Sequence, residues 1–186
     1  MKHFILLILC LFYFYNSYSN VYVGMGYTHL IPIEALEKYN TKGQGFMLEL
    51  TNRNYCKLWY GVRMDYLLLT KAEGTVNYYE RIIGINGFIK YAPFVNDCYD
   101  NKIIPYLHSK FGFSSITPTE IFTNQGSNLG IGGSLGVGLA YNFKLFKKCW
   151  MIELEGLLYA PNSIQRSENR ENLQSLNVGL TVSMGL

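Results

Sequence analysis

Eight ionisable side chains stand out in a sequence of 186 residues in which Asp, Glu, Lys and Arg make up only 16%. They comprise four acids, three bases and one histidine: Glu49, Arg63, Asp65, Lys90, His108, Lys110, Glu153 and Glu155. Each lies in a segment where polar or small residues alternate with large apolar ones. Brought together away from water, they could form a compensated ion-pair network. Around an open passage, the same residues could line a conduit for small solutes.

Catalysis is a further chemistry that these residues could carry. His108 and Ser109, with Glu153 or Glu155 as a third member, would supply a base, a nucleophile and an orienting acid. Neighbours on a strand point to opposite faces, however, so His108 and Ser109 cannot easily meet. The glycine-rich run over residues 130–138 lacks the G-x-G-x-x-G spacing of a phosphate-binding loop. We therefore expect no catalytic residues, no metal site and no cofactor.

Strands are the elements that must position these side chains. Large apolar residues alternate with small or polar ones in eight segments, over residues 21–28, 46–51, 58–68, 83–91, 106–113, 129–141, 150–158 and 176–186. A period of two predicts strands, and an even number of them suits closure of an up-and-down antiparallel barrel. Long connections near 30–43, 69–77, 115–126 and 160–172 alternate with shorter ones near 52–57, 93–102 and 142–149. This alternation predicts that the long loops lie at the end opposite the termini.

The apolar faces of these segments carry more large side chains than an eight-stranded barrel can enclose, because such an interior is only just filled by side chains. They are expected to point outward, and aromatic residues near the segment ends, such as Tyr66 and Trp150, would then sit at headgroup level. The opposite face of the sixth segment is almost all glycine, which suits a narrow lumen. The predicted fold class is therefore all-β, an eight-stranded antiparallel up-and-down transmembrane β-barrel. A soluble lipocalin-like binding barrel, with its apolar side inside, is the alternative.

The first residues resemble an export signal. Lys2 precedes an apolar run from Phe4 to Phe14, and the small-residue pattern ends at Ser19. The run is short for a bilayer-spanning helix, which needs roughly 20 residues. We expect a signal peptide over residues 1–19, cleaved after Ser19, and a single barrel domain over residues 20–186.

Net charge limits the partners of the chain. Its formal charge of +3 is too small to imply a polyanionic ligand, so no nucleic acid is expected.

The chain resembles, in its whole architecture, the small eight-stranded bacterial outer-membrane proteins of the OmpA/OmpX type, often described as outer-membrane β-barrel or porin-family proteins. This resemblance implies a place in the bacterial outer membrane, contact with its lipid and a monomeric state. The last segment, which ends at Leu186, resembles the terminal strand that the outer-membrane assembly machinery recognises, with leucine in place of the usual aromatic residue.

A structural or surface-contact role in the cell envelope is the function expected from this resemblance, and a small-solute channel is the alternative. Outer-membrane lipid A deacylases resemble the chain in size, but they use a His-x-Ser spacing that is absent here. A lipid A-modifying enzyme is therefore a less favoured alternative.

Three cysteines, Cys56, Cys98 and Cys149, fall in the shorter connections, at one end of the predicted barrel. Cys56 opens the third segment and Cys98 follows the fourth, so about one strand spacing of 4.8 Å separates their bases. A disulfide needs Cα atoms roughly 4.4 to 6.8 Å apart. This favours a Cys56–Cys98 disulfide, and three unpaired thiols are the alternative.

Overall fold

In the computed structural model of the chain, residues 20–55, 57–95, 103–119, 128–164 and 173–186 are described. They form eight strands and one short 3-10 helix: β1 (Val21–Glu34), η1 (Leu36–Lys38), β2 (Asn40–Tyr55), β3 (Leu58–Lys71), β4 (Tyr79–Tyr91), β5 (Ile103–Pro118), β6 (Asn128–Leu145), β7 (Lys148–Ile164) and β8 (Leu173–Gly185). No helix within these ranges is long and apolar enough to cross a membrane.

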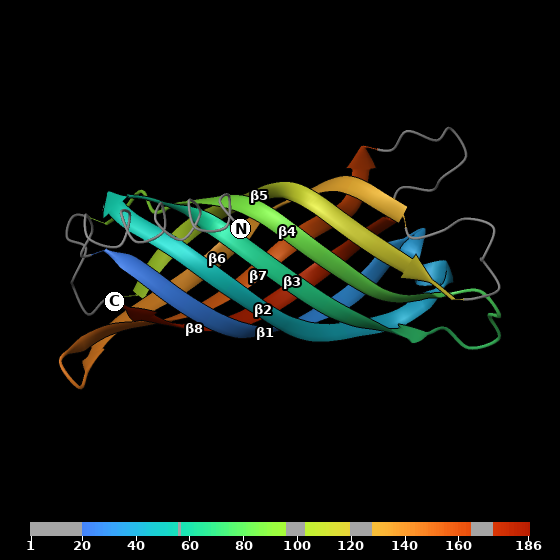
Figure 1. Ribbon diagram of the computed structural model, residues 1–186, viewed down its shortest axis with the longest axis horizontal. Coiled ribbons are helices and arrows are strands. Elements are labelled where there is room, and N and C mark those ends of the chain that lie inside the picture. The colour runs from blue at the N-terminus through green and yellow to red at the C-terminus, as the bar shows by residue number, and fades with distance from the viewer. Residues whose placement is uncertain (1–19, 56, 96–102, 120–127, 165–172) are drawn as a thin grey trace, which may run out of the picture.

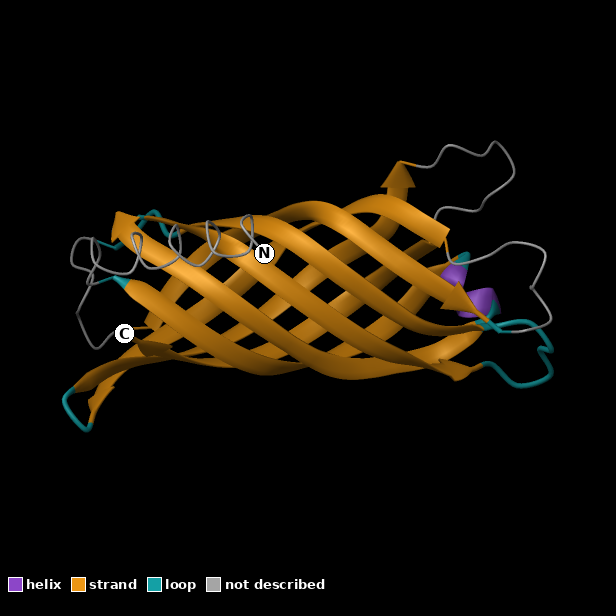
Figure 2. Cartoon of the chain, in the orientation of Figure 1, coloured by secondary structure: helices purple, strands orange, loops and turns teal. Residues whose placement is uncertain are grey.

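The strands close into a single barrel. Each pairs antiparallel with its neighbours in chain order, and β8 completes the ring by pairing with β1 from Tyr22↔Gly185 to Glu34↔Leu173. Figure 1 shows the strands wound obliquely around the barrel axis, and Figure 2 shows that η1 lies at one end. The predicted fold class of an eight-stranded antiparallel barrel is confirmed.

Side chains alternate across the barrel wall as the pattern of the sequence predicts. On β6, Leu135 and Val137 are 69% and 60% exposed on the outside, whereas Ser134, between Gly133 and Leu135, is buried on the inside. Successive residues of a strand point to opposite faces, so one sequence builds an apolar outer wall and a separate lumen. Large apolar side chains are exposed on the outer face of every strand.

The strands are longer than the sequence pattern predicted. The predicted loop over residues 30–43 is wrong, because β1 continues to Glu34 and β2 begins at Asn40. Likewise, β7 continues to Ile164, into the loop predicted over 160–172. Backbone hydrogen bonds between neighbouring strands continue beyond the residues in which large apolar side chains alternate, so the strands are longer than the alternating pattern.

The predicted alternation of long and short connections is also wrong. Residues 92–102, which join β4 to β5 at the end with the chain termini, form a longer connection than residues 72–78 at the opposite end. Cys56 and Cys98 lie outside the described residues, so their disulfide stays a prediction. Cys149 carries a free thiol.

Candidate functional site: a charged and closed lumen

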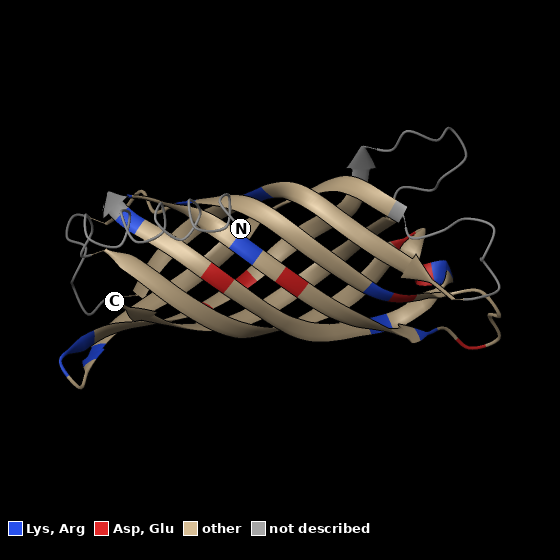
Figure 3. Cartoon of the chain, viewed as in Figure 1, with Lys and Arg blue, Asp and Glu red and all other residues tan. Residues whose placement is uncertain are grey.

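All eight ionisable residues singled out in the sequence lie on the lumen side of the barrel wall. They come from β2, β3, β4, β5 and β7, and each is at most 3% exposed. Figure 3 shows charged residues on the middle of the barrel, separate from those at its ends. We call these eight side chains the lumen network.

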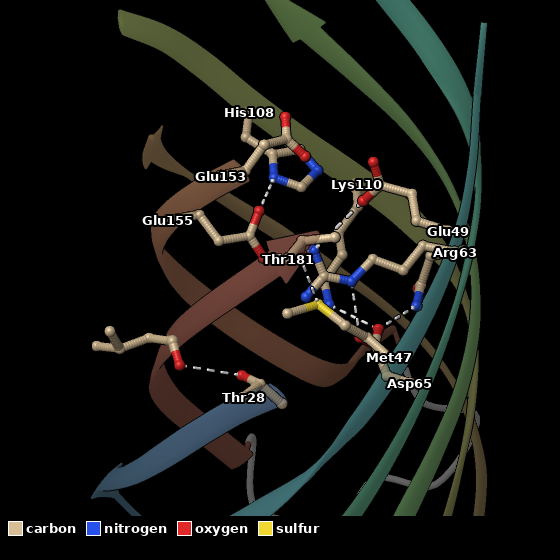
Figure 4. Close-up of polar contacts among 12 residues, drawn as sticks. Thr28, Met47, Glu49, Arg63, Asp65, His108, Lys110, Glu153, Glu155 and Thr181 are labelled. Atoms are coloured by element: carbon tan, nitrogen blue, oxygen red, sulfur yellow. Dashed lines mark hydrogen bonds and ion pairs between the residues drawn. The ribbon is translucent and has the colours of Figure 1, made fainter. Parts of the chain in front are cut away.

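Arg63 on β3 is the centre of the lumen network (Figure 4). Its Nε donates to Asp65 Oδ1 at 2.8 Å, and its Nη1 contacts Glu155 on β7. Glu155 Oε2 also lies 2.9 Å from His108 Nδ1, and Asp65 Oδ2 accepts from Lys110 Nζ at 2.8 Å. The Arg63 guanidinium therefore joins β3 to β7 through Glu155, and Asp65 extends the contacts to Lys110 on β5.

Lys90 on β4 extends the lumen network toward the end with the termini. Its Nζ donates to Glu49 Oε1 at 2.6 Å and to Glu153 Oε2 at 2.8 Å. Glu49 Oε2 in turn lies 3.9 Å from Arg63 Nη1, which joins both groups into one continuous cluster. Each charge of the lumen network has a charged neighbour, as burial in a low dielectric requires.

Neutral side chains supply further partners to these charges. Thr51 donates to Glu49 Oε1 at 2.6 Å, and Asn86 Nδ2 donates to Asp65 Oδ2 at 3.1 Å. Aromatic faces approach the two lysines as well, with Lys90 Nζ 5.5 Å from the Tyr106 ring centroid and Lys110 Nζ 4.4 Å from that of Tyr159. Such contacts stabilise a cation that has left water.

An apolar cluster closes the lumen at the end with the termini. We call it the terminus-side plug, and its buried residues are Tyr22, Trp59, Ala92, Val95, Ile104, Tyr106, Ala140 and Met151. Arg53 lies against this plug, 2% exposed, with its guanidinium carbon 4.1 Å from the Trp59 ring centroid. Its Nη1 donates to Asn142 Oδ1 at 2.9 Å.

Arg53 was missed as a lumen residue because the second predicted segment stopped at Thr51. Its position in the sequence, two residues beyond Thr51 and four beyond Glu49, already gives it the same inward parity.

A second apolar cluster closes the opposite end. This loop-side plug contains Leu30, Leu36, Leu67, Leu69, Ile82, Ile116, Tyr159 and Leu173. Leu36 comes from η1 and is fully buried, so the connection between β1 and β2 folds over the barrel mouth. Asn40 holds this end together, since its Nδ2 donates to the Tyr79 carbonyl at 2.8 Å and its Oδ1 accepts from the Tyr79 N–H.

The glycine-rich inner wall of β6 does not leave an open space, contrary to what a conduit requires. A Cβ added at Gly138 would meet the ring of Tyr106, which comes from β5, and one added at Gly136 would meet Leu157. Met47 similarly lies where a Cβ at Gly179 would stand. The missing side chains are therefore replaced by large ones from other strands.

The geometry gives no support to a hydrolytic site at His108. His108 is buried in the lumen, whereas Ser109 lies on the exposed outer face. The described part of the chain also contains no cluster of His, Cys, Asp or Glu arranged to hold a metal ion.

A comparison with solved structures found matches to small outer-membrane proteins. Neisserial surface protein A (NspA) matches with a TM-score of 0.60 and 12% identity, over 89% of this chain and 97% of that one. The outer membrane protein OprG from Pseudomonas aeruginosa matches with a TM-score of 0.42 and 10% identity, over 89% and 93%. No protein-family model and no curated protein matches the sequence. The likeness to NspA supports the eight-stranded barrel fold.

Proposed function

We propose that the chain is an integral barrel of the bacterial outer membrane with a structural or surface-contact role in the cell envelope. The single observation that carries the role is the lumen, which is filled from end to end by the terminus-side plug, the lumen network and the loop-side plug. Such a barrel presents its outer wall and its loops, rather than a passage, to the surroundings.

The outer wall supports a place in a membrane. Large apolar side chains such as Met25, Phe46 and Leu135 are each more than two-thirds exposed. A soluble protein rarely exposes apolar patches larger than a few hundred Å². A lipocalin-like barrel would bury these residues and expose the charged ones, which is the reverse of the arrangement here.

The lumen argues against the channel alternative. A solute moving through the barrel would have to pass Lys90 and Arg63, which are 0% and 1% exposed and held by ion pairs. Opening that path would separate buried opposite charges, at a cost of several kcal/mol. His108 and Ser109 lie on opposite faces of the barrel wall and cannot act together, so we propose no enzymatic activity.

The proposed role includes expectations about export, assembly, oligomeric state and lipid contact. The leader over residues 1–19 directs export and is cleaved after Ser19, and β8 is read by the outer-membrane assembly machinery. The protein works as a monomer, because the barrel closes between β8 and β1 and so has no edge strand to pair with a second copy. Its lipid partner is the outer membrane itself.

Membrane fractionation tests the location. We expect the mature protein in the outer-membrane fraction, extractable only with detergent, and with a gel mobility that changes on boiling. Recovery of the folded protein in the soluble fraction without detergent would contradict the proposal.

Single-channel recording in planar bilayers tests the role. A lumen closed by protein should give no stable open level for the full mature chain. Sustained conductance steps that scale with the number of inserted molecules would favour a small-solute channel instead.

A further inference from the structure

The hairpin that joins β6 to β7 projects beyond the rest of the barrel at the end with the termini (Figure 1). Tyr141 is the last β6 residue with a described partner on β5, and Trp150 is the first β7 residue paired with β8. Among the described residues, the strand pairing of residues 142–149 runs across the hairpin itself, as in Phe143↔Trp150 and Leu145↔Lys148. We call residues 142–149 the hairpin tip.

The turn of the hairpin tip has an unusual composition. Phe146 and Lys147 have φ angles of 50° and 60°, the left-handed conformation that both central residues of a type I′ hairpin turn adopt. Asn-Gly is the preferred pair in such a turn, because other residues are strained there. Phe146 is also 87% exposed, more than any other large apolar side chain in the described part of the chain. A strained turn that presents an aromatic ring to the outside points to a contact made by that ring.

An aromatic row connects the hairpin tip to the outer wall of the barrel. Tyr141 stacks on Phe143 with ring centroids 6.2 Å apart, and Phe143 stacks on Trp150 at 6.5 Å. Trp150 Nε1–H donates to the Leu145 carbonyl at 3.2 Å, which fixes the indole against the hairpin. The apolar surface that faces lipid along β6 thus continues to the turn.

Positive charge surrounds the same turn. Lys144, Lys147 and Lys148 are all exposed, and Figure 3 shows the basic residues at the projecting hairpin. Aromatic rings beside exposed lysines, at the edge of a membrane-facing surface, match the interface between acyl chains and anionic headgroups. We infer that the hairpin tip binds the anionic phospholipid headgroups of the leaflet around this end of the barrel, with Phe146 inserted among them. This inference rests on the proposed membrane location.

A nitroxide at position 146 tests the inference. The full mature chain, with Phe146→Cys and with Cys56, Cys98 and Cys149 changed to serine, is spin-labelled and reconstituted in two kinds of vesicle. One contains phosphatidylcholine alone, and the other contains phosphatidylcholine with phosphatidylglycerol. Collisions with oxygen and with a water-soluble nickel chelate report whether the label is in lipid or in water. We expect the label to be shielded from nickel in the phosphatidylglycerol vesicles and far less in the neutral ones.

Lysine variants show whether the positive charges of the hairpin tip contribute to its binding or whether the tip is simply close to the bilayer. Each of Lys144→Gln, Lys147→Gln and Lys148→Gln should lower the ratio of bilayer-bound to free label by about fivefold in phosphatidylglycerol vesicles. The matched control is Lys57→Gln, an exposed lysine just before β3 at the same end of the barrel but outside the hairpin tip, which should leave the ratio unchanged.

Flotation of the vesicles on a density gradient makes the possible failures distinguishable. Protein that does not float with the vesicles contradicts the membrane location, and the inference falls with it. Protein that floats while its label stays equally accessible to nickel in both vesicle types contradicts the inference alone. An equal loss of binding in Lys57→Gln would also overturn it, because the effect would then not belong to the hairpin tip.

Discussion

The lumen and the outer wall of this barrel are built from the same strands but follow different rules. Met64 faces outward and is 46% exposed, whereas its neighbours Arg63 and Asp65 face inward and are each 1% exposed. In the proposed membrane location, apolar wall residues contact fluid acyl chains, so any apolar side chain suits these positions. Lumen residues contact one another at fixed distances, so each depends on the identity of its partners. Substitutions inside should therefore cost more than matched substitutions outside.

The largest difference is expected for arginine. Arg63→Ala leaves Asp65 and Glu155 without their shared cation, and loss of one member of a buried ion pair costs about 3 to 5 kcal/mol. The matched control is Arg81→Ala on the exposed face of β4, where the side chain contacts Thr117 and the cost should be about 0 to 1 kcal/mol. Urea unfolding of the reconstituted barrel measures both. Equal unfolding midpoints would show that Arg63 is not held in a buried network.

A charge placed on the outer wall should have a smaller effect that depends on depth. Leu135→Arg, near the middle of β6, should destabilise the barrel in lipid by about 2 to 4 kcal/mol, and Leu129→Arg, near the loop end of the same strand, by about 0 to 1. The same unfolding experiment compares them. If both variants were as stable as the parent in a bilayer, the outer wall would not face its hydrocarbon core.

Glycine gives the smallest difference. Gly138→Ala puts a methyl group into the ring of Tyr106, which is itself packed against Trp59 at a centroid distance of 5.6 Å, and overpacking costs about 1 to 3 kcal/mol. On the outer wall, a Cβ at Gly156 meets nothing within 4 Å, so Gly156→Ala should be neutral or stabilise by up to about 1 kcal/mol. Thermal unfolding in detergent measures both variants. A destabilised Gly156→Ala beside an unchanged Gly138→Ala would reverse the assignment of the two faces.

The number of strands, the closure of the barrel and the inward side of each strand could be predicted from the sequence, because a period of two fixes the face of every residue. The placement of Glu49 and Lys90 in the lumen follows from this two-residue alternation alone. Their ion pair also depends on the register of β2 and β4, which both pair with β3. The pattern of a single strand carries no information about register.

The two plugs could not be predicted in the same way. Leu30 and Ile82 alternate in step with the inward-facing residues of β1 and β4, but they lie outside the segments predicted over 21–28 and 83–91. The fit of Tyr106 over Gly138 is likewise a contact between strands. The glycines of β6 predict a narrow lumen, but the sequence does not show which side chain lies beside them; in the barrel, the Tyr106 ring of β5 lies beside Gly138.

The two tryptophans of the chain allow the most direct test, because one lies on each side of the wall. Trp59 is fully buried in the terminus-side plug, and Trp150 lies on the outer face, stacked on Phe143. In vesicles, the Trp59→Phe variant reports on Trp150 alone, and the Trp150→Phe variant reports on Trp59 alone. Brominated phosphatidylcholine quenches a tryptophan in contact with lipid, and acrylamide quenches one in contact with water. We expect brominated lipid to quench Trp150 strongly and neither agent to quench Trp59. Quenching of Trp59 by acrylamide as strong as that of free indole would show a water-filled lumen and contradict the closed barrel.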